Sequence, residues 1–66
     1  MYHTPVSSSN VKSTGYENGV LEVLFKNGLM YRWNVPESTY REFMTAPSKG
    51  SFVHSRLKGR FGERQV

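Results

Sequence analysis

Basic side chains near the C-terminus are the residues of this chain best suited to bind a ligand. Up to Pro47, four lysines and arginines are balanced by four glutamates, whereas the last nineteen residues carry five basic residues and one glutamate. The formal net charge of +4 therefore lies in this C-terminal segment, which indicates a polyanionic partner. The candidate nucleic-acid-binding residues are Lys49, Arg56, Lys58, Arg60 and Arg64, together with Arg32 in the neutral part of the chain.

The segment Ser48-Lys49-Gly50-Ser51 has two interpretations. At a helix N-terminus, its backbone amides and the helix dipole favour bound phosphate. The same residues form an ordinary helix cap after Pro47, with the Ser48 hydroxyl accepting a backbone N–H. We favour the cap.

Tyr31 and Trp33 lie two residues apart in a strand-like segment, so both side chains point to the same face of a sheet. Exposed, they form a stacking platform for single-stranded bases. Buried, they supply the packing that a chain of 66 residues with nine aromatic side chains needs for its core. We favour core packing.

Catalytic and metal-binding chemistry have little support in the sequence. The chain has no aspartate and no cysteine, and its two histidines show no ligand spacing with the glutamates. His54 has Ser51 and Ser55 nearby, but no third group that would orient it as a general base. No glycine-rich nucleotide motif is present. We therefore expect no catalytic residue, no metal and no cofactor.

Length and composition predict one small domain covering residues 1–66, with flexible ends at 1–8 and 62–66. The absence of cysteine suits a reducing compartment, so we expect a cytoplasmic location. No apolar run approaches the ~20 residues of a membrane span, and we expect no membrane contact.

The hairpin at residues 21–35 organises the predicted fold. Asn27-Gly28 marks the turn, and a three-residue loop with a left-handed Gly28 places the large apolar side chains on one face. Glu22 and Arg32 then face each other on the opposite side of the sheet. The predicted pairs on the apolar face are Phe25–Leu29, Val23–Tyr31 and Leu21–Trp33.

A weaker strand at residues 11–16 precedes this hairpin, joined to it by a tight turn at Asn18-Gly19. That turn pairs Tyr16 with Leu21 and Thr14 with Val23. Val11 is then out of phase, and a bulge near Lys12-Ser13 would bring it inward.

Two short helices cover the apolar face. The first follows Pro36, which suits the first helical turn, and ends at Ala46-Pro47; the second runs from the Ser48 cap to about Lys58. Helical spacing selects their inward residues, which are Tyr40, Phe43 and Met44, then Phe52, Val53 and Leu57. The predicted fold is α+β, a three-stranded antiparallel β-meander packed against two short C-terminal helices.

The order and spacing of several short motifs resemble the KTSC domain family over residues 6–61. Trp33 stands where the family's Tyr-x-Tyr motif has its second tyrosine. The family is named for the C-terminal segment of some lysyl-tRNA synthetases and also occurs as small bacterial and phage proteins. The matching residues are Gly15-Tyr16, Leu21, Val23, Phe25, Asn27-Gly28, Tyr31-Arg32-Trp33, Val35-Pro36, Tyr40, Ala46-Pro47-Ser48-Lys49-Gly50 and Phe52.

The resemblance implies RNA binding through the attachment of such domains to a tRNA enzyme, an association rather than a mechanism. Two hypotheses stay open. In the first, the chain is a non-catalytic module that binds RNA or another polyanion through its basic C-terminal helix and tail. In the second, it is a protein-interaction or structural module with an acidic protein partner, in a phage-related setting.

Overall fold

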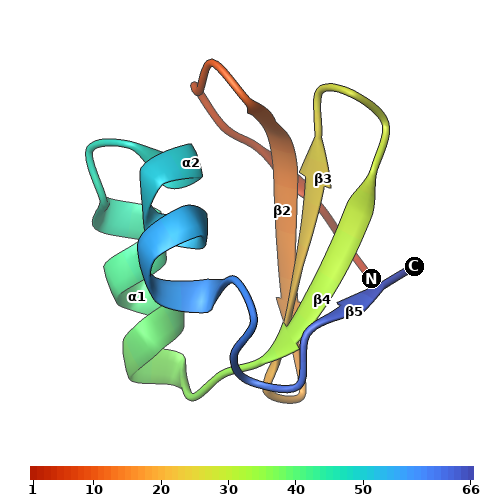
Figure 1. The fold of residues 1–66 in the computed structure, drawn as a ribbon, viewed down its shortest axis with the longest axis vertical. Coiled ribbons are helices and arrows are strands. Elements are labelled where there is room, and N and C mark those ends of the chain that lie inside the picture. Colours follow the sequence, from red (N-terminus) through yellow and green to blue (C-terminus); the bar gives the residue numbers. More distant parts are fainter.

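The computed structural model describes all 66 residues and places five strands and two helical segments in two layers (Figure 1). The second helical segment continues without a break from an α-helical turn, α2, into a π-helical turn, η1. The elements are β1 (Thr4–Pro5), β2 (Val11–Glu17), β3 (Val20–Phe25), β4 (Met30–Asn34), α1 (Glu37–Thr45), α2 (Lys49–Phe52), η1 (Val53–Leu57) and β5 (Arg64–Gln65).

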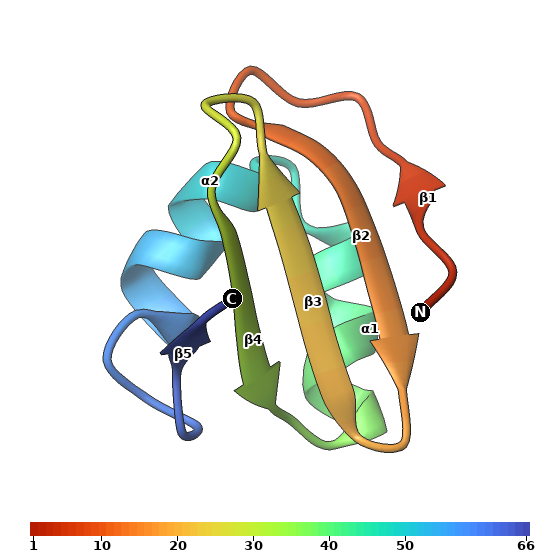
Figure 2. The same cartoon turned by 90° about the vertical axis from the view of Figure 1, so that its right-hand side faces the viewer.

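The strands form one antiparallel sheet in the order β1-β2-β3-β4-β5, and both helical segments cover the same face of it (Figures 1 and 2). The α+β class and the central meander are as expected, but the predicted number of three strands was wrong. Two edge strands of two residues each come from the end segments 1–8 and 62–66, whose flexibility stays a prediction. Strands this short carry too little alternation for a sequence pattern to reveal them.

The register of the β3–β4 hairpin confirms the bulged turn. Val23 pairs with Tyr31 and Glu22 with Arg32. The backbone N–H of Phe25 donates to the carbonyl of Leu29 at 2.8 Å, and Gly28 has a φ of 92°, which favours glycine. The apolar side chains at alternate positions, among them Val23 and Tyr31, therefore share the face that the helices cover, whereas the paired Leu24 and Met30 point to the other face.

The predicted bulge in β2 is also present. The register of β2 against β3 shifts between Val11 and Ser13, and Val11 is fully buried as a result. Asn18 and Gly19 both have positive φ angles, 51° and 77°, as a type I′ turn requires. This turn sets Thr14 opposite Val23, as expected.

The helical layer begins after Pro36, which is the N-cap residue of α1 rather than a residue of its first turn. Ser48 caps α2, because its hydroxyl accepts the backbone N–H of Ser51 at 3.2 Å. The helix then widens, and the N–H of Lys58 donates to the carbonyl of Val53 five residues earlier. Single π turns of this kind are frequent at functional sites, and here the turn directly precedes Lys58.

Nine buried apolar residues form one core between the sheet and the helices. Trp33 and Phe43 are its largest fully buried members, and Phe25, Tyr31 and Tyr40 pack against it while staying partly exposed. None of the helical segments has the length and apolar character needed to cross a bilayer. The buried apolar residues are Val11, Leu21, Val23, Trp33, Val35, Phe43, Phe52, Val53 and Leu57.

Candidate functional site

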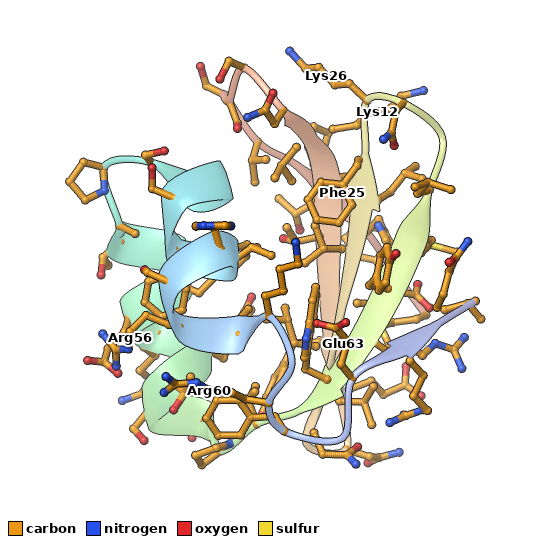
Figure 3. The ribbon with its side chains drawn as sticks, viewed as in Figure 1. Lys12, Phe25, Lys26, Arg56, Arg60 and Glu63 are labelled. Atoms are coloured by element: carbon orange, nitrogen blue, oxygen red, sulfur yellow. The ribbon has the colours of Figure 1, made fainter.

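The helical layer does not cover the inner face of the sheet completely. An open cleft of about 270 Å³ lies between the β3–β4 hairpin and α2–η1. Figure 3 shows Phe25 in the upper part of this opening and Glu63 in its lower part. The cleft is the concave site on the molecule with the most apolar lining, and its two walls differ in chemistry.

The sheet wall of the cleft is aromatic. The rings of Tyr31 and Trp33 lie nearly parallel, with centroids 5.9 Å apart and 19° between their planes, and Phe25 meets Tyr31 edge to face at 6.1 Å. Trp33 is only 1% exposed and belongs to the core, as the sequence favoured. Tyr31 and Phe25 stay half-buried, so part of their ring surface is open to a ligand.

The helix wall contributes polar groups, among them His54 and Lys58. Lys58 is exposed, and its ammonium group makes no ion pair or hydrogen bond with another side chain. Its charge is therefore available to an anion bound at the cleft. The sequence predicted Lys58 as a binding residue but gave no indication that it lies beside aromatic rings.

Glu63 closes the lower end of the cleft and was not among the predicted binding residues. Its Oε1 accepts the indole N–H of Trp33 at 3.0 Å and the backbone N–H of Gly59 at 2.9 Å. These two bonds hold the carboxylate in one place. The only sequence signal was that Glu63 is the one acidic residue in a segment of five basic residues.

Arg56 and Arg60 lie at the lower end of the helical layer (Figure 3). The Arg56 guanidinium donates to Glu42 at 3.2 Å and lies 5.0 Å from the ring centroid of Phe52. Arg60 is exposed, and its side chain contacts no acidic group. Figure 3 places Lys12 and Lys26 at the opposite end of the sheet. Of the predicted basic residues, only Lys58 lines the cleft, whereas Arg56 lies against α1 through its pair with Glu42.

Lys49 lies apart from this region and serves the fold. Its Nζ donates to the carbonyls of Met44 at 2.9 Å and Ala46 at 3.2 Å, at the C-terminal end of α1. A cation there satisfies carbonyls that the helix leaves without partners and offsets the helix dipole. Together with the Ser48 cap, this contact supports the capping interpretation of the segment.

Arg32 and Arg64 lie opposite each other on β4 and β5, on the face away from the helices. Arg32 Nε donates to Glu22 Oε2 at 2.6 Å, and Arg64 donates to the carbonyl of Gly62 at 3.1 Å. Like charges directly opposite on neighbouring strands destabilise a sheet. The negative charge of Glu22 offsets the repulsion between Arg32 and Arg64. These two arginines therefore do not contribute to the cleft.

Glu22 is buried, 4% exposed, on this outer face of the sheet. His3 bridges it to β2, with Nε2 2.5 Å from Glu22 Oε1 and Nδ1 2.8 Å from the hydroxyl of Ser13. Burial by itself raises the pKa of the Glu22 carboxyl, but the bonds and charges of His3 and Arg32 outweigh burial and hold that pKa below its ordinary value of 4.5.

The chain Ser13–His3–Glu22 has the residue order of a nucleophilic triad. Its position points to a structural role instead, because the carboxylate is shared with Arg32 and the N-terminal strand β1 pairs with β2 here. A Cβ on Gly15 would lie 2.7 Å from the carbonyl oxygen of Tyr2. The sequence missed this network because it connects the first residues to positions ten and nineteen residues away.

Comparison with known proteins agrees with the resemblance found in the sequence. The family model of the KTSC domain matches residues 7–61. The crystal structure of a KTSC domain protein from Yersinia pestis has a TM-score of 0.87 and 40% sequence identity, over 98% of this chain and 96% of that one. A comparison with curated proteins finds no match. The chain therefore belongs to the KTSC domain family.

Proposed function

We propose that this domain is a non-catalytic module that binds single-stranded RNA in the cleft between its aromatic sheet face and its basic helix. The observation that carries the proposal is the placement of half-buried Tyr31 and Phe25 opposite the unpaired ammonium group of Lys58. Proteins that bind single strands combine these two features, because bases stack on aromatic rings while cations neutralise phosphates.

The number of phosphate contacts is small and can be counted from the basic side chains that are available to RNA. The side chains of Lys58 and Arg60 make no ion pair. Arg56 lies over the Phe52 ring and makes an exposed pair with Glu42, which is worth about 1 kcal/mol or less. Two to three phosphates can therefore be neutralised. For a single strand, at about −0.7 per contact, the slope of log affinity against log salt should lie at roughly −1.4 to −2.1.

Titration of a fluorescently labelled single-stranded RNA at several salt concentrations tests the proposal. Lys58→Gln with Arg60→Gln should weaken binding and make its salt dependence about 1.4 less steep, because two phosphate contacts are lost. Lys12→Gln with Lys26→Gln is the matched control, since it removes two exposed cations at the far end of the sheet. Equal effects of the two sets of changes would contradict the proposal.

Absence of RNA binding at low salt would instead favour an acidic protein partner for the same surface, in a structural or phage-related assembly. The RNA titration therefore decides between the two candidate partners, RNA and an acidic protein. We further propose a cytoplasmic location, where RNA is available, and a bacterial or phage origin like that of the small members of the family.

A further inference from the structure

We infer that the cleft is a recognition site for a single guanine base, an inference that rests on the proposed RNA-binding function. The cleft holds one ammonium group, on Lys58, and one carboxylate, on Glu63. Guanine is the base whose edge presents a carbonyl acceptor, O6, beside two N–H donors, at N1 and N2. The Glu63 carboxylate can accept a hydrogen bond from a donor of that edge, while Lys58 neutralises the phosphate of the same nucleotide.

Lys58 and Glu63 line the same cleft, yet no ion pair joins them. Oppositely charged side chains five residues apart, both beside one opening, would be expected to pair if nothing held them apart. Glu63 is held by the N–H groups of Trp33 and Gly59. The Lys58 ammonium group and the second carboxylate oxygen of Glu63 therefore both stay free to contact a ligand in the cleft.

The carboxylate of Glu63 is ready to accept further hydrogen bonds. Its Oε1 receives both protein donors, and its Oε2 has no protein partner. Because the two bonds fix the group before any ligand arrives, little conformational freedom is lost on binding. A fixed carboxylate oxygen discriminates between bases by the N–H donors they offer, since a donor that meets no acceptor loses its hydrogen bond to water.

The aromatic wall explains why the ligand is a base rather than a free anion. Tyr31 stacks on buried Trp33 with one part of its ring, and the part that stays open faces the cleft. Stacking of a base on an aromatic side chain contributes to affinity whatever the base is. A volume of about 270 Å³ lies below the usual range of small-molecule pockets, so one ring system fits and two stacked nucleotides do not.

The test compares three nine-nucleotide RNAs, uridine at every position except the centre, which is guanosine, inosine or uridine. Inosine differs from guanosine only by the missing exocyclic amine, which is a donor to Glu63 in this arrangement. We expect the guanosine RNA to bind about tenfold more tightly than the inosine RNA, because the inosine RNA lacks one hydrogen bond to a charged group. The uridine RNA should bind most weakly.

Glu63→Gln is the decisive variant. Its Oε1 can still accept from Trp33 and Gly59, while an NH2 donor replaces the free oxygen. The guanosine and inosine RNAs should then bind with about equal affinity. The affinity for the uridine RNA should change by less than about twofold. Lys58→Gln is the matched control, because it should weaken the guanosine and inosine RNAs alike and leave their ratio unchanged.

The outcomes separate the inference from the proposed function. Equal, salt-dependent binding of all three RNAs would overturn the guanine site and leave RNA binding in place. No binding of any RNA at low salt would overturn both. Should Glu63→Gln fail to fold, the ratio between guanosine and inosine RNAs on the unmodified domain still decides the inference.

Discussion

The indole N–H of Trp33 donates to the carboxylate of Glu63 at 3.0 Å, which ties the centre of the core to the C-terminal segment. Trp33 is 1% exposed, whereas Glu63 lies at the surface, at the end of the cleft. One hydrogen bond thus connects a residue of the core to a residue of the proposed binding site. If the proposed function holds, changes at Trp33 should alter both stability and ligand binding.

Trp33→Ala should lower the free energy of unfolding by about 3–5 kcal/mol, because it removes the largest fully buried side chain and leaves a cavity. That loss is comparable to the whole stability of so small a domain. Urea denaturation followed by circular dichroism measures it. An unchanged unfolding midpoint would show that the core is assigned wrongly.

Trp33→Phe separates packing from hydrogen bonding. A phenyl ring keeps much of the buried aromatic area but has no N–H for Glu63, so we expect a loss of about 1 kcal/mol from that bond in addition to the loss in size. The guanosine preference should also weaken, since Glu63 is then held by Gly59 alone. A variant with lower stability and an unchanged preference would show that Trp33 does not position the carboxylate.

Glu22 should make the domain sensitive to acid. Its folded-state pKa lies below its ordinary value of 4.5, so the unfolded chain takes up this proton first as the pH falls. The stabilisation is fully present above about pH 4.5 and is lost as the pH drops through the folded-state pKa. Thermal unfolding between pH 3 and pH 7 measures the dependence.

Glu22→Gln isolates this contribution from those of the other glutamates. The variant should be about 1–3 kcal/mol less stable at pH 7, because Arg32 and His3 lose a buried charged partner. The gap between the two proteins should narrow as the pH falls. A gap that stayed constant down to pH 3 would mean that Glu22 is not ionised in the folded domain.

Gly15→Ala should displace the N-terminal segment from the outer face of the sheet. The new methyl group would lie 2.7 Å from the carbonyl oxygen of Tyr2, and that backbone has to move. We expect a loss of about 1–3 kcal/mol and faster amide exchange in the first strand. Ser13→Ala is the control, since it removes one bond to His3 without a clash; equal exchange in both variants would contradict the close approach.

Arg32 and Arg64 distinguish the structure-based site from the one predicted from charge alone. Both lie on the face away from the cleft. Arg64→Gln should therefore change RNA affinity by less than about twofold, whereas Lys58→Gln should weaken it severalfold, as measured by fluorescence anisotropy at low salt. Similar losses of affinity in the two variants would indicate that the whole basic C-terminal segment, and not the cleft, forms the binding surface.

The hairpin register was predictable because a two-residue turn would put Val23 and Tyr31 on opposite faces, whereas the three-residue loop puts them on the same face. Burial of large apolar side chains outweighs turn preference. The bulge at Val11 followed from the same requirement. Both predictions depend on residues close in sequence or on strong alternation. The edge strands β1 and β5 have neither, since each pairs only two residues with its neighbour.

The site was harder to predict for a related reason. Charge counting identified Lys58 but could not separate it from Lys49, whose ammonium group binds helix carbonyls instead of solvent. Glu63 and Trp33 are thirty residues apart, and no local pattern indicates their bond. Sequence indicated which residue types were available, and only their tertiary placement separated the residues that line the cleft from residues that stabilise the fold.

A single measurement tests the central claim that the aromatic cleft is the RNA-binding site. Two-dimensional NMR spectra of the 15N-labelled domain, recorded during titration with single-stranded RNA at low salt, report every backbone amide and the Trp33 indole N–H. We predict that the largest shifts cluster on Tyr31, Val53, Lys58 and the Trp33 indole, which line the cleft. Shifts centred on Arg32 and Arg64, or no shifts at all, would contradict it.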